Sequence, residues 1–208
     1  MNILILGATG PTGRHVVDLA IAAGDTVTVL ARRPEALADL ADQVNVVAGD
    51  ATSHTDVAKA MIGQDAVISA LGRSTSVRAD NLFTRAAAAV IAAAEEEGVS
   101  RLVWMSSFGV GDTYHSASVM QKIMYRTFLR DIYANKHLAE KAIRSSDLDW
   151  TLVYPTLLTK GLAKGTYRAD DRLPMKGNPK ISRADVAAFM FEAAHSPEWI
   201  NRDGVITD

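Results

Sequence analysis

Three glycines near the N-terminus limit what this chain can fold into more than any other feature of its sequence. A short apolar run, Asn2–Leu6, leads directly into glycines at positions 7, 10 and 13. In such a segment the first glycine allows a tight turn, the second leaves backbone amides accessible, and the third lets a helix pack closely on the strand. The helix N-terminus then favours an anion. The segment predicts a strand–turn–helix that binds the pyrophosphate of a dinucleotide; the alternative is a glycine-rich turn that only packs the helix.

Apolar runs alternate with helical patterns along the rest of the chain. Strands are predicted over Asn2–Leu6, Thr26–Ala31, Val44–Ala48, Ala66–Ala70, Arg101–Ser106, Trp150–Tyr154 and Gly204–Thr207. Helices are predicted over Thr12–Ala23, Glu35–Asp42, Thr55–Ile62, Asp80–Glu97, Val119–Arg144 (with a break) and Arg183–Ala194. Nearly continuous apolar strands are typical of a parallel sheet that is buried on both faces. The predicted fold class is α/β: a Rossmann-type, doubly wound parallel sheet in three α/β/α layers, as a single domain over residues 1–208.

Composition excludes several classes of function. The chain has no cysteine, so disulfides, thiol catalysis and cysteine-ligated metals are excluded, and a reducing compartment is indicated. Its net charge of −2 and its lack of a polybasic tail give no reason to expect a nucleic acid partner. No apolar run approaches the ~20 residues of a membrane span, and no signal peptide is recognisable at the N-terminus. We expect a cytoplasmic protein without a membrane partner.

Two segments interrupt the alternation and are predicted to be substrate-side loops, 109–117 and 156–180. Both follow the carboxyl end of a strand, where an open α/β sheet binds its ligand. From Thr156 to Arg183, seven basic residues stand against two acids, which leaves a local charge of +5. An anionic small-molecule acceptor is therefore expected there, because a positive field concentrates anions. The alternative is an ordinary solvated loop.

The end of the second strand indicates which dinucleotide binds. Proteins that prefer NAD(H) usually carry an acid there, whereas an arginine accommodates the additional phosphate of NADP(H). Here Arg32 and Arg33 stand at that point and no acid does. Guanidinium groups suit a phosphate, so NADP(H) is favoured over NAD(H). The alternative is that both arginines are solvated surface residues.

Small residues at the ends of the third and fourth strands complete the predicted cofactor cleft. Asp50, followed by Ala51, ends the third strand where an adenine ring would lie; Asp50 equally suits a cap for the next helix. Ala70, Leu71 and Gly72 end the fourth strand, where a dinucleotide can pass close to the backbone.

Together these motifs resemble the atypical short-chain dehydrogenase/reductases, in particular the NAD(P)H-binding group that includes biliverdin-IXβ/flavin reductases and NmrA-like proteins. The resemblance covers nearly the whole chain. It is carried by Gly7-Ala8-Thr9-Gly10-Pro11-Thr12-Gly13, Gly49-Asp50, Ser106-Ser107, Asn135-Lys136 followed by Glu140, Trp150–Pro155 with Leu158-Thr159, and Ile181–Ala187. Members often carry an arginine before the proline of the Trp150–Pro155 motif, where this chain has Tyr154, so a role of that arginine does not carry over.

The resemblance implies where the cofactor lies. It places the pyrophosphate on Gly10 to Thr12, the adenosine phosphate near Arg32 and Arg33, and the nicotinamide near Ala70, Leu71, Ser106, Ser107, Lys136 and Pro155. The residues predicted to bind the cofactor are Gly7, Thr9, Gly10, Pro11, Thr12, Gly13, Arg32, Arg33, Asp50, Ala51, Ala70, Leu71, Gly72, Ser106, Lys136, Tyr154 and Pro155.

The catalytic tyrosine of conventional short-chain dehydrogenases is missing. Their Tyr-x-x-x-Lys pair exchanges a proton with the substrate, but Ile132 stands four residues before Lys136. Tyr133, three residues before, shares the helix face, although packing is the commoner role of such a residue. The resemblance instead implies direct hydride transfer to an acceptor that needs little acid catalysis, with Ser107 and Lys136 as the predicted catalytic residues. The alternatives are that Ser106 and Ser107 only end the strand and that Lys136 is an exposed helical lysine.

The sequence thus predicts an NADPH-dependent oxidoreductase that transfers hydride to a conjugated acceptor of the flavin, quinone or tetrapyrrole type. The rival is an NmrA-like sensor that binds NADP(H) without turnover; an epimerase that retains its cofactor is a further alternative. The five histidines show no ligand spacing, so no metal is expected. The Met120–Tyr133 stretch reads as a helix packing face that serves as a dimer surface or lid, and the protein is expected to be a monomer or a homodimer.

Overall fold

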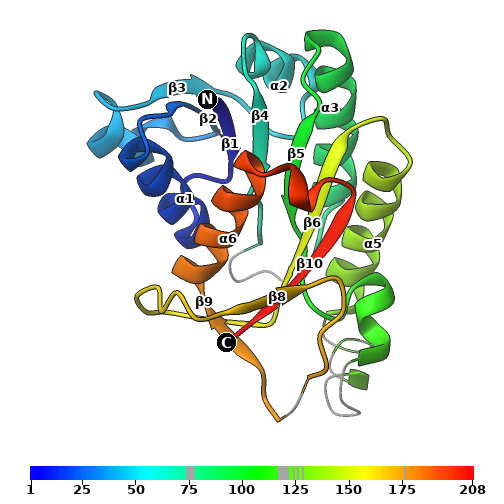
Figure 1. Ribbon diagram of the computed structural model, residues 1–208. Coiled ribbons are helices and arrows are strands. Elements are labelled where there is room, and N and C mark those ends of the chain that lie inside the picture. Colours follow the sequence, from blue (N-terminus) through cyan, green and yellow to red (C-terminus); the bar gives the residue numbers. More distant parts are fainter. Residues whose placement is uncertain (74–77, 117–121, 124, 126, 128, 176) are drawn as a thin grey trace.

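A sheet of eight strands forms the centre of the computed structural model, which describes residues 1–73, 78–116, 122–123, 125, 127, 129–175 and 177–208 (Figure 1). The strands lie in the order β3-β2-β1-β4-β5-β6-β10-β8. Their bounds are β1 Asn2–Leu6, β2 Thr26–Ala31, β3 Asn45–Ala48, β4 Ala66–Ser69, β5 Arg101–Met105, β6 Asp149–Pro155, β8 Arg168–Asp170 and β10 Arg202–Thr207. Every neighbouring pair is parallel except β10 and β8, which are antiparallel. The predicted doubly wound sheet is confirmed.

The inner strands are buried on both faces, as their apolar runs predict. In β1, the side chains from Ile3 to Leu6 have no exposed surface. The strand lies between β2 and β4, so that Leu4 is paired with Thr28 on one side and with Val67 on the other. The order of the strands reverses at β1, and the crevice between the carboxyl ends of β1 and β4 is where such sheets bind their ligands.

Helices cover both faces of the sheet and complete the three layers (Figure 1). One apolar core joins the sheet to α1 (Pro11–Ala22) and α6 (Arg183–His195), and a second joins it to α2 (His54–Met61), α3 (Leu82–Glu97) and α5 (Arg130–Arg144). Three 3₁₀ helices connect them: η1 Pro34–Leu40, η2 Gly111–Ser116 and η3 Pro197–Trp199. The helix predicted over Glu35–Asp42 is therefore a 3₁₀ helix. No helix in the described ranges combines the length and the apolar character needed to cross a membrane.

The segment after β6 contains strands where the sequence predicts a loop. β7 (Leu157–Thr159) and β9 (Lys180–Ser182) form a parallel two-stranded sheet, and β8 extends the main sheet at its edge. Each of these strands has three residues, too few to show an alternation of apolar and polar side chains. The predicted loop 109–117 likewise contains η2, and its last residue, Ala117, lies outside the described residues. Much of the predicted packing face Met120–Tyr133 also lies outside them.

Candidate functional site

The turn from β1 to α1 has the geometry that its glycines predict. Gly7 has a φ of +84°, and a Cβ on it would lie 2.8 Å from the carbonyl oxygen of Ala70. A Cβ on Gly13 would lie only 2.2 Å from the carbonyl oxygen of Gly7. These two glycines are required by the packing of the turn itself. A Cβ on Gly10 would meet only the Gly7 carbonyl oxygen, at 3.2 Å, so the outer side of Gly10 is open.

The N-terminus of α1 is suited to an anion. Gly10 is the N-cap residue and has no side chain to cap the helix, Pro11 occupies the first turn, and no acid is present in that turn. The amides and the positive end of the helix dipole therefore have no side-chain partner of their own. Together with the open side of Gly10, this cradle fits the pyrophosphate of a dinucleotide.

Arg32 and Arg33 follow β2 with exposed side chains, and neither forms an ion pair with another residue in the part of the chain that the structure describes. Arg32 lies near enough to Asp50 for its charge to contribute to lowering the pKa of that carboxyl. The guanidinium groups are thus available at the predicted place of the adenosine phosphate. Their role in binding stays a prediction.

Asp50 stabilises the turn after β3 and does not cap α2. Its Oδ1 accepts a hydrogen bond from the amide of Thr52 at 2.8 Å, and this bond is the main cause of its lowered pKa. The N-cap of α2 is Ser53, whose Oγ accepts from the amide of Asp56. The capping alternative for Asp50 is therefore wrong. Ala51, Ala70 and Leu71 are buried or half-buried, whereas a Cβ on Gly72 would meet nothing within 4 Å.

Lys136 is buried and directed at the end of β5. Its side chain lies in α5 with only 5% of the residue exposed, so the alternative of an exposed helical lysine is wrong. The Nζ atom donates to the carbonyl oxygen of Ser106 at 2.9 Å and to the Oγ of Ser107 at 2.8 Å. It also lies 4.9 Å from the centre of the Phe83 ring. Burial lowers the pKa of this ammonium group to about 8.

The two serines after β5 have different surroundings. Ser106 is 1% exposed, and its hydroxyl donates to the Oε1 of Glu140. Ser107 is half-buried, and its hydroxyl is the one that accepts from Lys136. The side chain of Ser106 therefore holds the strand end to α5, while the hydroxyl of Ser107 is the one placed for contact with a ligand.

Neither tyrosine near this point reproduces the conventional tyrosine–lysine pair. The hydroxyl of Tyr133 donates to the carbonyl oxygen of Phe108 at 3.2 Å, and burial raises its pKa. Tyr154 is 1% exposed and accepts a hydrogen bond from Arg144 at 3.1 Å.

Two residues of α5 take part in this site although the sequence did not single them out individually. Asn135 caps α3, because its Oδ1 accepts from the amides of Phe83 at 2.9 Å and Thr84 at 3.3 Å. Glu140 is 2% exposed, and its burial raises its pKa to about 7. Both stand beside Lys136 at spacings that put polar residues on the inner face of a helix. A helix that packs on a sheet usually has apolar residues on its inner face, so polar residues at these positions were the sequence signal that could have identified Asn135 and Glu140.

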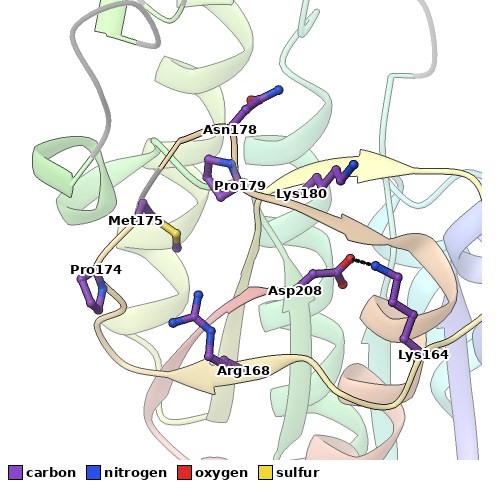
Figure 2. Close-up of a pocket in the computed structure, with 8 residues that line it drawn as sticks. All are labelled: Lys164, Arg168, Pro174, Met175, Asn178, Pro179, Lys180 and Asp208. Atoms are coloured by element: carbon purple, nitrogen blue, oxygen red, sulfur yellow. Dashed lines mark hydrogen bonds and ion pairs between the residues drawn. The ribbon is translucent and has the colours of Figure 1, made fainter.

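A cavity of about 450 Å³ opens beyond the carboxyl end of β10 (Figure 2). It is lined by Lys164, Arg168, Pro174, Met175, Asn178, Pro179, Lys180 and Asp208. Lys164 Nζ forms an ion pair with Asp208 at 2.5 Å, which Figure 2 shows at one side of the lining residues. The three cations outnumber the one carboxylate, so the lining is net positive. Three of the seven basic residues between Thr156 and Arg183 line this cavity.

Asp185 anchors the near wall of this cavity to the fold. Its carboxylate is fully buried and accepts the amides of Lys164 and Gly165, both at 2.9 Å. Its other oxygen accepts from the hydroxyl of Ser182, the N-cap residue of α6. The motif Ile181–Ala187 therefore begins a helix and fixes the cavity wall at the same time.

A second cavity, of about 620 Å³, lies on the α5 side of β10. Its walls include Phe108 and Trp150 together with two ion pairs, Arg144 with Asp203 at 2.6 Å and Arg202 with Asp171 at 3.1 Å. Within the described ranges, no group of three or more histidines and carboxylates is arranged to hold a metal ion.

Comparison with known proteins identifies the family. A family described as NAD(P)H-binding matches residues 7–197, which include the glycine turn, the Lys136 site and all of α6. The chain belongs to this NAD(P)H-binding family. It is an NAD(P)-binding Rossmann protein of the oxidoreductase type, as the sequence motifs predict.

Proteins named as reductases are among the relatives of this NAD(P)H-binding protein. It is 26% identical to an isoflavone reductase of Glycine max over 97% of this chain and 68% of that protein. It is 30% identical to the solved structure of ChuY, an anaerobillin reductase from Escherichia coli O157:H7, with a TM-score of 0.84 over 99% of this chain and 96% of that one. A short-chain dehydrogenase/reductase from Veillonella parvula, solved in complex with NADP, shares the fold at 17% identity, covering 100% of this chain and 94% of its own, with a TM-score of 0.81.

Proposed function

We propose that this protein is an NADPH-dependent reductase that transfers hydride to an extended, conjugated and anionic acceptor, of the flavin, quinone or tetrapyrrole type. The observation that carries the proposal is the buried Lys136 ammonium group, 2.8 Å from the Oγ of Ser107, at the strand end where a nicotinamide would lie. A bound NADPH supplies the hydride. The chain supplies the proton, because Lys136 donates to Ser107 and burial lowers the pKa of its ammonium group to about 8.

The arginines after β2 support the choice of NADPH. Arg32 and Arg33 are exposed and have no ion-pair partner among the described residues, so they are available to a phosphate. A guanidinium group without a competing carboxylate binds a phosphate through charge-assisted hydrogen bonds. An NAD-type ribose contact would instead need an acid, and β2 ends without one.

The distance between Ser107 and the cationic cavity beyond β10 supports an extended acceptor. Ser107 follows β5, and the cationic cavity lies at the end of β10, two strands away in the sheet. Neighbouring strands lie about 4.8 Å apart, so the two places are separated by about 10 Å or more. An acceptor that is reduced at Ser107 and held by Arg168 and Lys180 must span that distance and carry an anionic group at its far end. A flavin with a phosphate or a linear tetrapyrrole with carboxylates has both properties.

Oxidation of NADPH, followed at 340 nm, tests the proposal. FMN, biliverdin and a soluble quinone serve as acceptors, and Lys136→Met serves as the variant without the donor. We expect turnover by the native protein and a loss of about 10²–10⁴-fold in Lys136→Met, the range for removal of a general acid. Tight binding of NADPH without turnover of any of these acceptors would contradict the proposal and favour a cofactor sensor.

The cationic cavity gives a second test. FMN should have a lower KM than lumiflavin, which has no phosphate, and the advantage should shrink between about 0.01 and 0.15 M salt as the Debye length falls from about 30 to 8 Å. Arg168→Glu with Lys180→Glu should abolish it. Lys160→Glu is the matched control, because Lys160 belongs to the same basic segment but does not line the cavity. An equal loss in the control would show that the whole segment, and not this cavity, attracts the acceptor.

A further inference from the structure

Glu140 is a carboxylate buried at the centre of the site. It stands one helical turn after Lys136 in α5 and is 2% exposed. Its Oε1 accepts the hydroxyl of Ser106, and Tyr154 lies near enough to contribute to lowering the pKa of this carboxyl. The serine that bonds to Glu140 is also the residue whose carbonyl oxygen accepts from Lys136 Nζ at 2.9 Å. Glu140 and Lys136 are therefore joined through Ser106.

Other titratable groups surround Glu140 on three elements. On α5, the Nδ1 of His137 lies 3.9 Å from its Oε2, and Arg144 stands one turn further along. On β6, Tyr154 accepts from Arg144, and on β10, Asp203 pairs with Arg144 at 2.6 Å. Arg144 is thus already neutralised by Asp203. Among the described residues Glu140 has no direct ion pair with Lys136, so the two charges interact through the low-dielectric interior.

Burial acts on the two groups in opposite senses, and each charge stabilises the other. Burial raises the pKa of Glu140 to about 7 and lowers that of Lys136 to about 8. The ammonium of Lys136 contributes a lowering of the Glu140 pKa, and the carboxylate of Glu140 contributes a raising of the Lys136 pKa. Near neutral pH, the ionised form of one therefore favours the ionised form of the other.

The hydrogen bonds of Glu140 do not by themselves require a carboxylate. A glutamine at this position has nearly the same shape and can accept the hydroxyl of Ser106 through its amide oxygen. What glutamine lacks is the negative charge. A buried charge is costly, so its presence one turn from a buried lysine points to a function of the charge.

We infer that Glu140 is a positioning residue for proton delivery: its carboxylate keeps Lys136 protonated beside Ser107, where the acceptor is reduced. The inference rests on the proposed reductase function. In the reaction the acceptor gains a hydride from the reduced nicotinamide and a proton from Lys136, passed by the hydroxyl of Ser107. Lys136 is left neutral and regains its proton from water, and Glu140 remains ionised throughout.

The direct test is the titration of Lys136, which needs no turnover. Lysine labelled with ¹³C at Cε is followed by NMR against pH, and Lys136→Met identifies the signal. In Glu140→Gln the titration midpoint of Lys136 should fall by at least about one pH unit, the usual effect of an opposite charge at short range. Glu140→Asp, which keeps the charge, should restore most of the shift. Glu95→Gln, an exposed position of α3, is the control and should move nothing.

Activity should follow the titration. In Glu140→Gln, the alkaline limb of the pH profile of kcat/KM should move to lower pH by the same amount as the Lys136 midpoint. Activity at pH 6 should stay within a fewfold of the native value, whereas activity at pH 8.5 should fall about tenfold or more. A merely structural role would lower activity at all pH values alike. If Glu140→Gln does not fold, Glu140→Met replaces the carboxylate with a side chain that needs no hydrogen bond, and the same shift is expected.

The two failures are distinguishable. An unmoved midpoint of Lys136 in folded Glu140→Gln or Glu140→Met overturns the role of Glu140 and leaves the reductase proposal intact. A midpoint that moves as expected, in a native protein that reduces no acceptor, overturns the function but keeps the coupling of the two charges. In that case proton delivery to an acceptor is refuted.

Discussion

Lys136 and Tyr133 lie one helical turn apart, yet only the lysine is placed for chemistry. The Nζ of Lys136 reaches Ser107 at 2.8 Å, whereas the Tyr133 hydroxyl is occupied by the Phe108 carbonyl oxygen at 3.2 Å. Tyr133→Phe should therefore keep kcat/KM within a fewfold, while removal of a general acid costs about 10²–10⁴-fold. A collapse of that size in folded Tyr133→Phe, measured as NADPH oxidation, would restore the tyrosine mechanism.

The preference for NADPH should depend on Arg32 and Arg33. Loss of a charge-assisted hydrogen bond costs about 1.5–3 kcal/mol, so the double change to alanine should weaken NADPH binding at least tenfold and leave NADH binding nearly unchanged. Fluorescence titration with both cofactors measures this. Arg202→Ala is the matched control, since it removes a half-buried arginine that is paired with Asp171 on the opposite side of the sheet from β2. Equal losses for NADPH and NADH would show that the arginines do not read the phosphate.

At single positions the sequence indicated which residues belong to the site, but not what surrounds their side chains. It selected Ser107 and Lys136 correctly as neighbours, because both end up at the carboxyl end of β5. It assigned Ser107 to catalysis and Ser106 to the cofactor, but it could not predict that the hydroxyl of Ser106 faces α5, since only the path of the chain after β5 decides this. Glu140 stood in a family motif without a role of its own, because its carboxylate is unusual only once it is known to be buried.

Within the β1–α1 unit, two glycines of one motif should respond differently to alanine. Gly13→Ala brings a Cβ to 2.2 Å from the Gly7 carbonyl oxygen, a clash with backbone that must disturb the turn. Gly10→Ala meets the same oxygen at 3.2 Å and needs only a small adjustment. We expect Gly13→Ala to lower the melting temperature by several degrees, as a loss of about 1–3 kcal/mol would.

Gly10→Ala should instead keep the melting temperature within about two degrees and weaken dinucleotide binding tenfold or more, because its methyl group occupies the side open to the pyrophosphate. Thermal unfolding without cofactor and NADPH titration separate the two effects. Undiminished binding in Gly10→Ala would mean that the glycine turn serves only to pack α1.

The elements that the sequence predicted best are the ones with long or fully apolar patterns. β1 and β2 have the predicted bounds, and α6 extends one residue further than predicted. The prediction failed in the segment after β6, where three-residue strands are held by pairing to distant strands such as β10. Tertiary contacts hold this segment in place, such as the hydrogen bonds from the amides of Lys164 and Gly165 to Asp185. The local sequence pattern does not predict such contacts.

In the whole molecule, the two buried charges of the site should make stability depend on pH. The pKa of Glu140 is raised from 4.5 to about 7 by burial, so between these values the folded state binds more protons than the unfolded state and stability falls as pH rises. The pKa of Lys136 is lowered from 10.5 to about 8, so above pH 8 the unfolded state binds more protons and stability rises with pH. Both charges are buried together between about pH 7 and pH 8, and there their combined cost to stability is greatest.

Glu140→Gln should therefore be more stable than the native protein at pH 7.5 and about equally stable at pH 5. Each pKa unit is worth about 1.4 kcal/mol, so the difference in unfolding free energy should grow by on the order of 2 kcal/mol between these pH values. Urea unfolding at both pH values measures it, with the exposed Glu95→Gln as the control. A difference that does not change with pH would mean that the pKa of Glu140 is not raised in the folded protein. A difference that grows, in a variant that also loses activity at alkaline pH, would show that the fold gives up stability at this position for the charge that the proton donor requires.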